Sequence, residues 1–141
     1  MIILDTNVLS EQIKSRPDAA VVEWAASVAT TELFTTALTE AEMFAGMEIM
    51  PMGRRRSALA GELTRLFSHE FLGRILFFDS LAAQALSTMR LRRDRTGAPI
   101  IDADAMIAAI ARAHGAVVAT RDVKAFTPFD IDIINPWTFT G

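Results

Sequence analysis

The sequence predicts an α/β fold in which a mainly parallel central sheet is flanked by helices. The first observation is a series of short apolar runs, bounded by turn residues, that are typical of fully buried strands. The second is that segments with apolar residues at helical spacing separate these runs. The third is that 51% of the 141 residues are apolar, which is enough for one buried core, and no repeat or linker interrupts them. Strands that alternate with helices favour a parallel sheet, so residues 1–141 are expected to form one domain.

Cap residues and prolines mark the predicted elements in the first half of the chain. The run Ile2-Ile3-Leu4 ends at the turn and cap residues Asp5-Thr6-Asn7, which predicts a strand that leads into a helix. Pro17-Asp18 opens a second helix, and Pro51 ends a third. The expected elements are strands over residues 2–4 and 33–36, and helices over residues 8–13, 18–28 and 38 to about 50.

Glycine and aspartate mark the boundaries in the second half. One amphipathic helix is expected between Gly53 and Gly73, and Asp79-Ser80 can cap the next. A further helix begins at Asp102, and Gly115 stands in the favoured position directly after its end. The remaining expected elements are a helix from residue 81 to about 91, a helix over 102–114, and strands over 75–78, 116–120 and 131–134.

The composition excludes several classes of protein. Because the chain has no cysteine, it has no disulfide, no thiolate metal site, no iron–sulfur cluster and no cysteine nucleophile. No apolar run approaches the roughly 20 residues of a membrane-spanning helix, and the first residues lack the features of a secretory signal. We therefore expect a cytoplasmic protein with no membrane partner.

Arginine makes up twelve of the fourteen cationic residues, although the formal net charge is −3. Arginine suits phosphate and carboxylate partners better than lysine does, because its planar guanidinium offers parallel donors. The arginines gather at Arg54-Arg55-Arg56 and at Arg90, Arg92, Arg93 and Arg95. Each group is either a solvated surface or a phosphate-binding patch, and the sequence leaves both interpretations open.

Acidic residues stand where the predicted strands end or where neighbouring helices begin. In an open parallel sheet, ligands bind beyond the carboxyl ends of the strands, so these carboxylates are expected to share one edge. Each also has a structural interpretation, as a helix cap, a partner of the helix dipole, an exposed helix residue or a turn former. The residues are Asp5, Glu40 or Glu42, Asp102 or Asp104, and Asp122.

Convergence of these carboxylates predicts a metal site. Carboxylates in a partly buried site repel one another, and a bound cation relieves that repulsion. Oxygen ligands in a chain without cysteine suit Mg²⁺ or Mn²⁺, whereas His69 and His114 are interpreted as structural. Without four such acids the formal net charge becomes +1, so the remaining surface could accept a phosphodiester.

Several stretches, in order along nearly the whole chain, match a known family. They are Leu4-Asp5-Thr6-Asn7-Val8-Leu9-Ser10-Glu11, Thr39-Glu40-Ala41-Glu42-Met43-Phe44-Ala45-Gly46, Asp102-Ala103-Asp104-Ala105-Met106-Ile107-Ala108-Ala109, and Ala119-Thr120-Arg121-Asp122 with Ile134-Asn135-Pro136-Trp137. Together they resemble PIN-domain proteins, especially the VapC and FitB toxins of bacterial toxin–antitoxin pairs. The resemblance implies a single PIN-like domain with Mg²⁺- or Mn²⁺-dependent ribonuclease activity.

The resemblance also implies roles for particular residues. The first acid of the family falls on Asp5, the helix glutamate on Glu42 and the third acid on Asp104. The fourth position, often asparagine in FitB-like members, is Asp122 here. These four are the expected catalytic and metal-binding residues. Three polar residues are expected to support them beside the metal: Thr6, Asn7 and Thr120.

Partners are implied in the same way. They are an RNA substrate, a second copy of the chain in a homodimer, and a small antitoxin that covers the acidic groove and contacts operator DNA on behalf of the complex. An alternative is a PIN-fold partner that mainly forms a DNA-binding repressor complex with its antitoxin and has little nuclease activity. A receiver-like signalling module is disfavoured, because Arg121 follows Ala119-Thr120 where such a module needs lysine, and Lys124 is the only lysine nearby.

Overall fold

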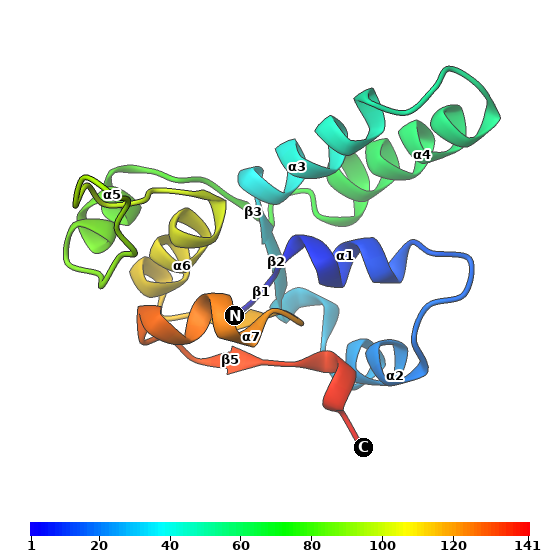
Figure 1. Cartoon of the computed structure of the whole chain (residues 1–141). Coiled ribbons are helices and arrows are strands. Elements are labelled where there is room, and N and C mark those ends of the chain that lie inside the picture. The colour runs from blue at the N-terminus through cyan, green and yellow to red at the C-terminus, as the bar shows by residue number, and fades with distance from the viewer.

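The computed structural model describes all 141 residues and contains a five-stranded sheet in which all neighbouring strands are parallel. The strand order is β3-β2-β1-β4-β5, so the chain begins in the middle of the sheet (Figure 1). This confirms the predicted α/β class and the parallel sheet. The strands are β1 (Ile2–Leu4), β2 (Leu33–Thr36), β3 (Ile75–Leu76), β4 (Val117–Ala119) and β5 (Ile133–Ile134).

Helices cover both faces of the sheet. The first four lie on one side and α5 and α6 on the other, while α3 and α4 extend away from the sheet as an antiparallel pair (Figure 1). None of the helices is both long and apolar enough to cross a membrane. The helices are α1 (Thr6–Gln12), α2 (Ala19–Ser27), α3 (Ala37–Glu48), α4 (Arg54–Arg65), α5 (Ser80–Ser87), α6 (Ala103–His114) and α7 (Val123–Phe126).

Each face of the sheet has its own apolar cluster. Ile3 and Val118 belong to the cluster that includes α5 and α6, whereas Leu4 and Ala119 belong to the cluster on the opposite face. Side chains alternate between the faces of a strand, so successive residues of β1 and β4 enter different clusters. Because both faces are covered, these strands are almost entirely apolar, as the sequence predicts.

Side-chain caps fix where the helices begin at the carboxyl edge of the sheet. The Asp79 carboxylate accepts the N–H of Ala82 at 3.0 Å, and the Asp102 carboxylate accepts the N–H of Ala105 at 2.9 Å. Gly115 ends α6 at φ +61°, a left-handed conformation that favours glycine. These three boundaries confirm the predictions made from the sequence.

Several elements differ from those predictions. Two strands are shorter than expected, because β3 covers Ile75–Leu76 instead of residues 75–78 and β5 covers Ile133–Ile134 instead of residues 131–134. The helix after Gly53 changes at Leu66–Glu70 into a π-helical turn, and α5 ends at Ser87 rather than near residue 91. After Ser87 the chain forms tighter turns, in which the N–H groups of Thr88 and Met89 donate to carbonyl oxygens three residues back, at 3.2 Å and 3.0 Å. Helix α7 was not expected, because four residues are too short to show a period.

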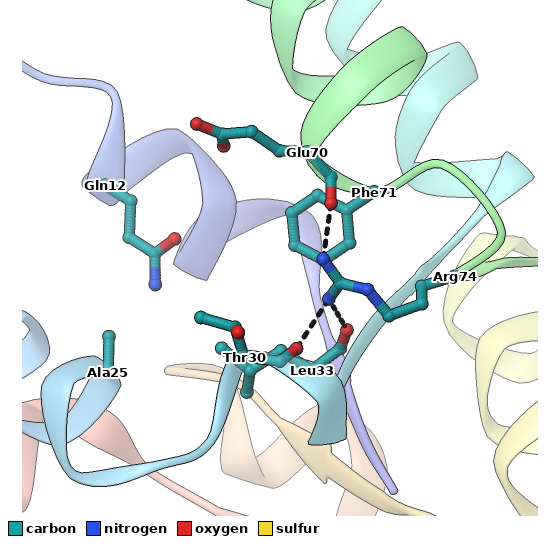
Figure 2. Close-up of a pocket in the computed structure, with 7 residues that line it drawn as sticks. All are labelled: Gln12, Ala25, Thr30, Leu33, Glu70, Phe71 and Arg74. Atoms are coloured by element: carbon teal, nitrogen blue, oxygen red, sulfur yellow. Dashed lines mark hydrogen bonds between the residues drawn. The ribbon is translucent and has the colours of Figure 1, made fainter.

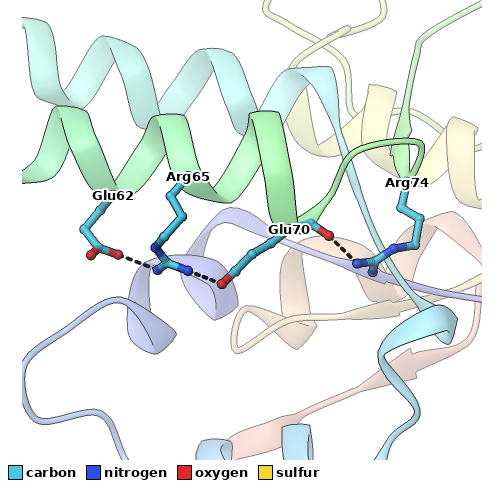
Figure 3. Close-up of polar contacts among 4 residues, drawn as sticks. All are labelled: Glu62, Arg65, Glu70 and Arg74. Carbon is cyan, nitrogen blue, oxygen red and sulfur yellow. Dashed lines mark hydrogen bonds and ion pairs between the residues drawn. The ribbon is translucent and has the colours of Figure 1, made fainter.

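The amino edge of the sheet is held by one arginine. Arg74, directly before β3, donates to the carbonyl oxygens of Thr30, Leu33 and Glu70. Arg65 forms ion pairs with Glu62, at 2.6 Å, and with Glu70 (Figure 3). These contacts join the end of the π-helical turn to the start of β2.

Candidate active site

Asp5 stands at the centre of the carboxyl edge, directly after β1, and is only 5% exposed. Its Oδ1 accepts the N–H of Thr6 at 2.8 Å, so Asp5 does cap α1. Its Oδ2 accepts the Thr120 hydroxyl at 2.8 Å and the Asn7 amide at 3.2 Å. The helix cap therefore uses one oxygen of the carboxylate, while Thr120 and Asn7 hold the other.

Thr120, directly after β4, fixes the position of Asp5. Its side chain is fully buried, and its Oγ1 also accepts the Asp122 N–H at 3.0 Å and the Asn7 amide at 3.2 Å. A hydroxyl has one donor and two acceptor positions, and all three are used here. The side-chain Oδ1 of Asn7 in turn accepts the backbone N–H of Arg121 at 3.1 Å. The ends of β1 and β4 are thus joined by a saturated network.

Glu42, on α3, is the helix glutamate that faces this edge. Its Oε1 lies 3.2 Å from the Thr6 hydroxyl, which is also 3.2 Å from the Thr39 hydroxyl. Glu40 makes no side-chain hydrogen bond, so the contacts separate two glutamates that helical periodicity could not. Thr39 is fully buried and was not predicted, although its place three residues before Glu42 puts both on one helix face.

The two aspartates at the start of α6 have different surroundings. Asp102 caps the helix and forms an ion pair with Arg92. Asp104 is half-buried and has neither a hydrogen bond nor an ion pair. Burial, followed by the charges of Asp5, Asp102, Asp122 and Glu42, raises the pKa of Asp104 to about 6. Asp104, the unpaired carboxylate of α6, is therefore the one that interacts electrostatically with the other acids.

The other carboxylates are coupled in the same way. Burial raises the pKa of Asp5, with a further contribution from the charge of Asp122, against hydrogen bonds led by Thr120 that lower it. Burial also raises the pKa of Glu42, and the charge of Asp5 adds to the shift. Asp122 is exposed, directly before α7, and its carboxylate makes no helix cap. Asp5, Glu42 and Asp122 therefore all lie within electrostatic reach of Asp104.

The donor set fits a hard divalent cation in its chemistry. Every candidate donor is an oxygen, and both histidines lie elsewhere, His69 in the π-helical turn and His114 at the end of α6. Like charges that raise one another's pKa are stabilised by a cation. In the observed side-chain conformations, no three acidic or histidine side chains form a ready ligand cage. Glu42 and Asp122 are the exposed members of the set.

Two hollows help to locate the site. A cavity of about 290 Å³ adjoins the acids and shares Thr6 and Glu42 with them, while its other walls are mainly apolar residues of α1, α3 and α4. A cavity of about 440 Å³ lies near the amino edge, between Gln12, Phe71 and Arg74 (Figure 2). Its charged groups are already paired, Arg74 with carbonyl oxygens and Glu70 with Arg65. The smaller cavity is thus the one that belongs to the candidate active site.

Comparisons with known proteins agree with this architecture. Residues 2–128 match the model of the PIN domain. The chain is 41% identical to "VapC ribonuclease Y4jK" of Sinorhizobium fredii, over 97% of this chain and 98% of that protein. It is 36% identical to "Toxin FitB" of Neisseria gonorrhoeae, over 97% of this chain and 99% of that toxin. A solved structure of FitAB bound to an IR36 DNA fragment has a chain that matches with a TM-score of 0.87 and 35% identity, covering 100% of this chain and 99% of that one.

Proposed function

The chain belongs to the PIN-domain family, and from this we propose that it is a metal-dependent ribonuclease and the toxin of a type II toxin–antitoxin pair. One observation carries the proposal. Carboxylates from separate parts of the chain lie at one edge of the sheet, and none of the four proposed ligands has a cationic partner. Burial, followed by the charges of the neighbouring acids, raises the pKa of Asp104 there. Repulsion among these charges opposes folding and a bound cation relieves it, so we infer that this edge binds a cation.

The proposed metal-binding residues are Asp5, Glu42 and Asp104, with Asp122 completing the set. A bound Mg²⁺ or Mn²⁺ supplies a water of lowered pKa and neutralises charge on the phosphate under attack. The Thr120 hydroxyl and the Asn7 amide hold Oδ2 of Asp5 in place, and the Thr6 hydroxyl orients Glu42. One of the carboxylates takes the proton of the attacking water as the phosphorus–oxygen bond to the leaving group breaks.

We further propose that the protein forms a homodimer and binds a small antitoxin, through which it contacts operator DNA only indirectly. Phe77 and Leu81, which follow the edge strand β3, are 66% and 64% exposed and are suited to self-association. The cavity beside Glu42 has apolar walls next to uncompensated acids. It therefore fits an antitoxin segment that carries an apolar side chain together with a basic one.

A matched pair of glutamates tests the nuclease. Protein freed of any partner is incubated with RNA and Mg²⁺ or Mn²⁺, and cleavage is followed by gel electrophoresis. We expect Asp5→Asn and Glu42→Gln to abolish cleavage, because each removes a proposed ligand charge. Glu40→Gln, two residues away on the same helix, makes the same charge change outside the site and should cleave as the unaltered protein does. Equal activity of the two glutamine variants would contradict the proposed ligand set.

The second candidate function is that of a binding protein in a repressor complex with its antitoxin. The similarity to a chain of the FitAB complex bound to an IR36 DNA fragment favours it, because that complex is itself bound to DNA. RNA that stays intact with every metal tested, together with operator binding by the complex, would establish this alternative.

A further inference from the structure

The chain has two pairs in which an arginine covers an aromatic ring. The Arg74 Cζ lies 4.8 Å from the centre of the Phe71 ring, and the Arg121 Cζ lies 5.1 Å from that of Trp137. The guanidinium of Arg74 donates to three backbone carbonyl oxygens: that of Leu33 at the start of β2, that of Thr30 in the turn before it, and that of Glu70 in the π-helical turn (Figure 2). The guanidinium of Arg121 makes no hydrogen bond and no ion pair, and the residue is exposed. Only the second pair therefore has donors and a stacking face to offer a ligand.

This free pair lies at the same edge of the sheet as the acids. The register pair Ala119 and Ile134 joins β4 to β5, and Arg121 and Trp137 follow it by two and three residues. The backbone N–H of Arg121 donates to the side-chain Oδ1 of Asn7 at 3.1 Å, and the side-chain Nδ2 of Asn7 donates to Asp5. The backbone of Arg121 is thus tied directly to the network that holds the central carboxylate.

Trp137 is a rigid support for the guanidinium. The backbone N–H of Trp137 donates to the Asn135 side-chain oxygen at 3.0 Å, and the intervening Pro136 is buried. Its half-buried ring packs against the apolar cluster that contains Leu4. The guanidinium of the exposed Arg121 lies over a ring fixed in this way.

We propose that Arg121, supported by Trp137, is a nucleotide-binding platform beside the acidic site. A base of single-stranded RNA stacks on the outer face of the guanidinium, and its N–H groups donate to the adjoining phosphate. Unpaired bases are commonly bound by stacking on arginine planes and aromatic rings, at sites that a positive charge helps to fill. The inference rests on the ribonuclease function proposed above, because it supplies the substrate-binding part of that site.

Binding and cleavage are measured separately to test the platform. The binding probe is a labelled single-stranded RNA of mixed sequence, titrated in Ca²⁺ by fluorescence anisotropy, and cleavage is measured with Mg²⁺. We expect Arg121→Lys and Arg121→Gln each to weaken binding and raise KM about tenfold, as loss of one base stack implies, with kcat within about twofold. Arg112→Lys and Arg112→Gln, at the far end of α6, make the same changes and should leave both readouts unaltered.

Two measurements separate stacking from charge and from folding. Successive bases of the probe are replaced by abasic sites. At one position the replacement should lower the affinity of the unaltered protein about tenfold and leave the affinity of Arg121→Lys unchanged. The chain has two tryptophans and no tyrosine, so Trp24→Phe leaves Trp137 as the sole tryptophan. Its emission should change when RNA is added.

The outcomes are distinct. Normal RNA binding by Arg121→Lys would show that Arg121 acts through its charge alone and would overturn the platform. Normal binding by both variants, with only a lower melting temperature, would show a role in stability alone and would overturn it as well. The unaltered protein could bind RNA with the expected dependence on Arg121 and yet fail to cleave it with any metal tested. In that case the nuclease proposal fails and the platform stands. If it neither binds nor cleaves, both fail.

Discussion

Charged side chains are paired at the amino edge of the sheet, whereas the candidate-site acids at its carboxyl edge are not. At the amino edge, the N-terminal ammonium pairs with Glu32 at 2.9 Å, Arg65 pairs with two glutamates, and Arg74 is surrounded by carbonyl oxygens (Figure 3). At the carboxyl edge, Asp5, Glu42, Asp104 and Asp122 have no cationic side chain among their partners, and the nearest ion pair holds Asp102 instead.

This contrast separates stability from function. Charges at the amino edge are satisfied within the chain, so they hold elements together and leave little for a ligand. Charges at the carboxyl edge repel one another, which is the expected condition of a site that awaits a cation. Loss of a paired charge should therefore destabilise the protein at the first edge, whereas loss of the unpaired charge of Asp104 at the second should stabilise it at the expense of activity.

The largest effect on stability is expected at the amino edge. Arg74→Ala removes three hydrogen bonds from a charged donor and the stacking on Phe71. We expect the free energy of unfolding to fall by about 2–3 kcal/mol and the melting temperature by about 10 °C, measured by urea and thermal denaturation. Cleavage per folded molecule should not change, because Arg74 is remote from the acids.

Arg74→Lys is the matched control for charge. It keeps the cation but loses the planar fork that reaches several carbonyl oxygens at once, so it should recover only part of the lost stability. An alanine variant as stable as the unaltered protein would remove the basis for the contrast between the two edges.

A smaller effect is expected from the hydroxyl that orients Asp5. Thr120→Val keeps the shape of the side chain but removes the hydrogen bond that lowers the pKa of Asp5. We expect a loss of about 1–2 kcal/mol, since buried polar groups lose their partner. The pKa of Asp5 should rise further, so binding of Mg²⁺, followed by calorimetry, should weaken more at pH 6 than at pH 8.

Thr120→Ser keeps the hydroxyl and should bind Mg²⁺ nearly as the unaltered protein does. If valine and serine behave alike in metal binding at both pH values, the hydrogen bond to Asp5 does not support the site.

The sequence predicted the sheet and the edge at which the acids gather. Apolar runs bounded by turn residues are a local signal, so all five strands were found, and parallel strands necessarily end at one edge. The choices of Glu42 over Glu40 and of Asp104 over Asp102 came only from the family resemblance. Their physical basis is tertiary: the hydroxyl of Thr6 reaches one glutamate, and Arg92 neutralises one aspartate.

The free arginine–aromatic pair was beyond sequence reasoning. Arg121 and Trp137 both lie in stretches that match the family, but their contact depends on the register of β4 and β5, which no local pattern specifies. The four-residue α7 was missed for a related reason, since it has too few residues for a period. Signals shorter than a helical turn, or shared between distant segments, are settled only by packing.

The smallest effect has the opposite sign and tests the contrast most directly. The pKa of Asp104, about 6 in the fold, lies above its ordinary value of 3.8, so folding disfavours its charged form. The stability linked to its protonation is fully present below pH 3.8 and is lost as the pH rises through about 6. Asp104→Asn should therefore raise the melting temperature of the metal-free protein at pH 7.5 by about 3 °C and change it little at pH 4. Mg²⁺ should reduce the difference by stabilising only the unaltered protein. An asparagine variant less stable than the unaltered protein at pH 7.5 would show that this edge is built for stability after all.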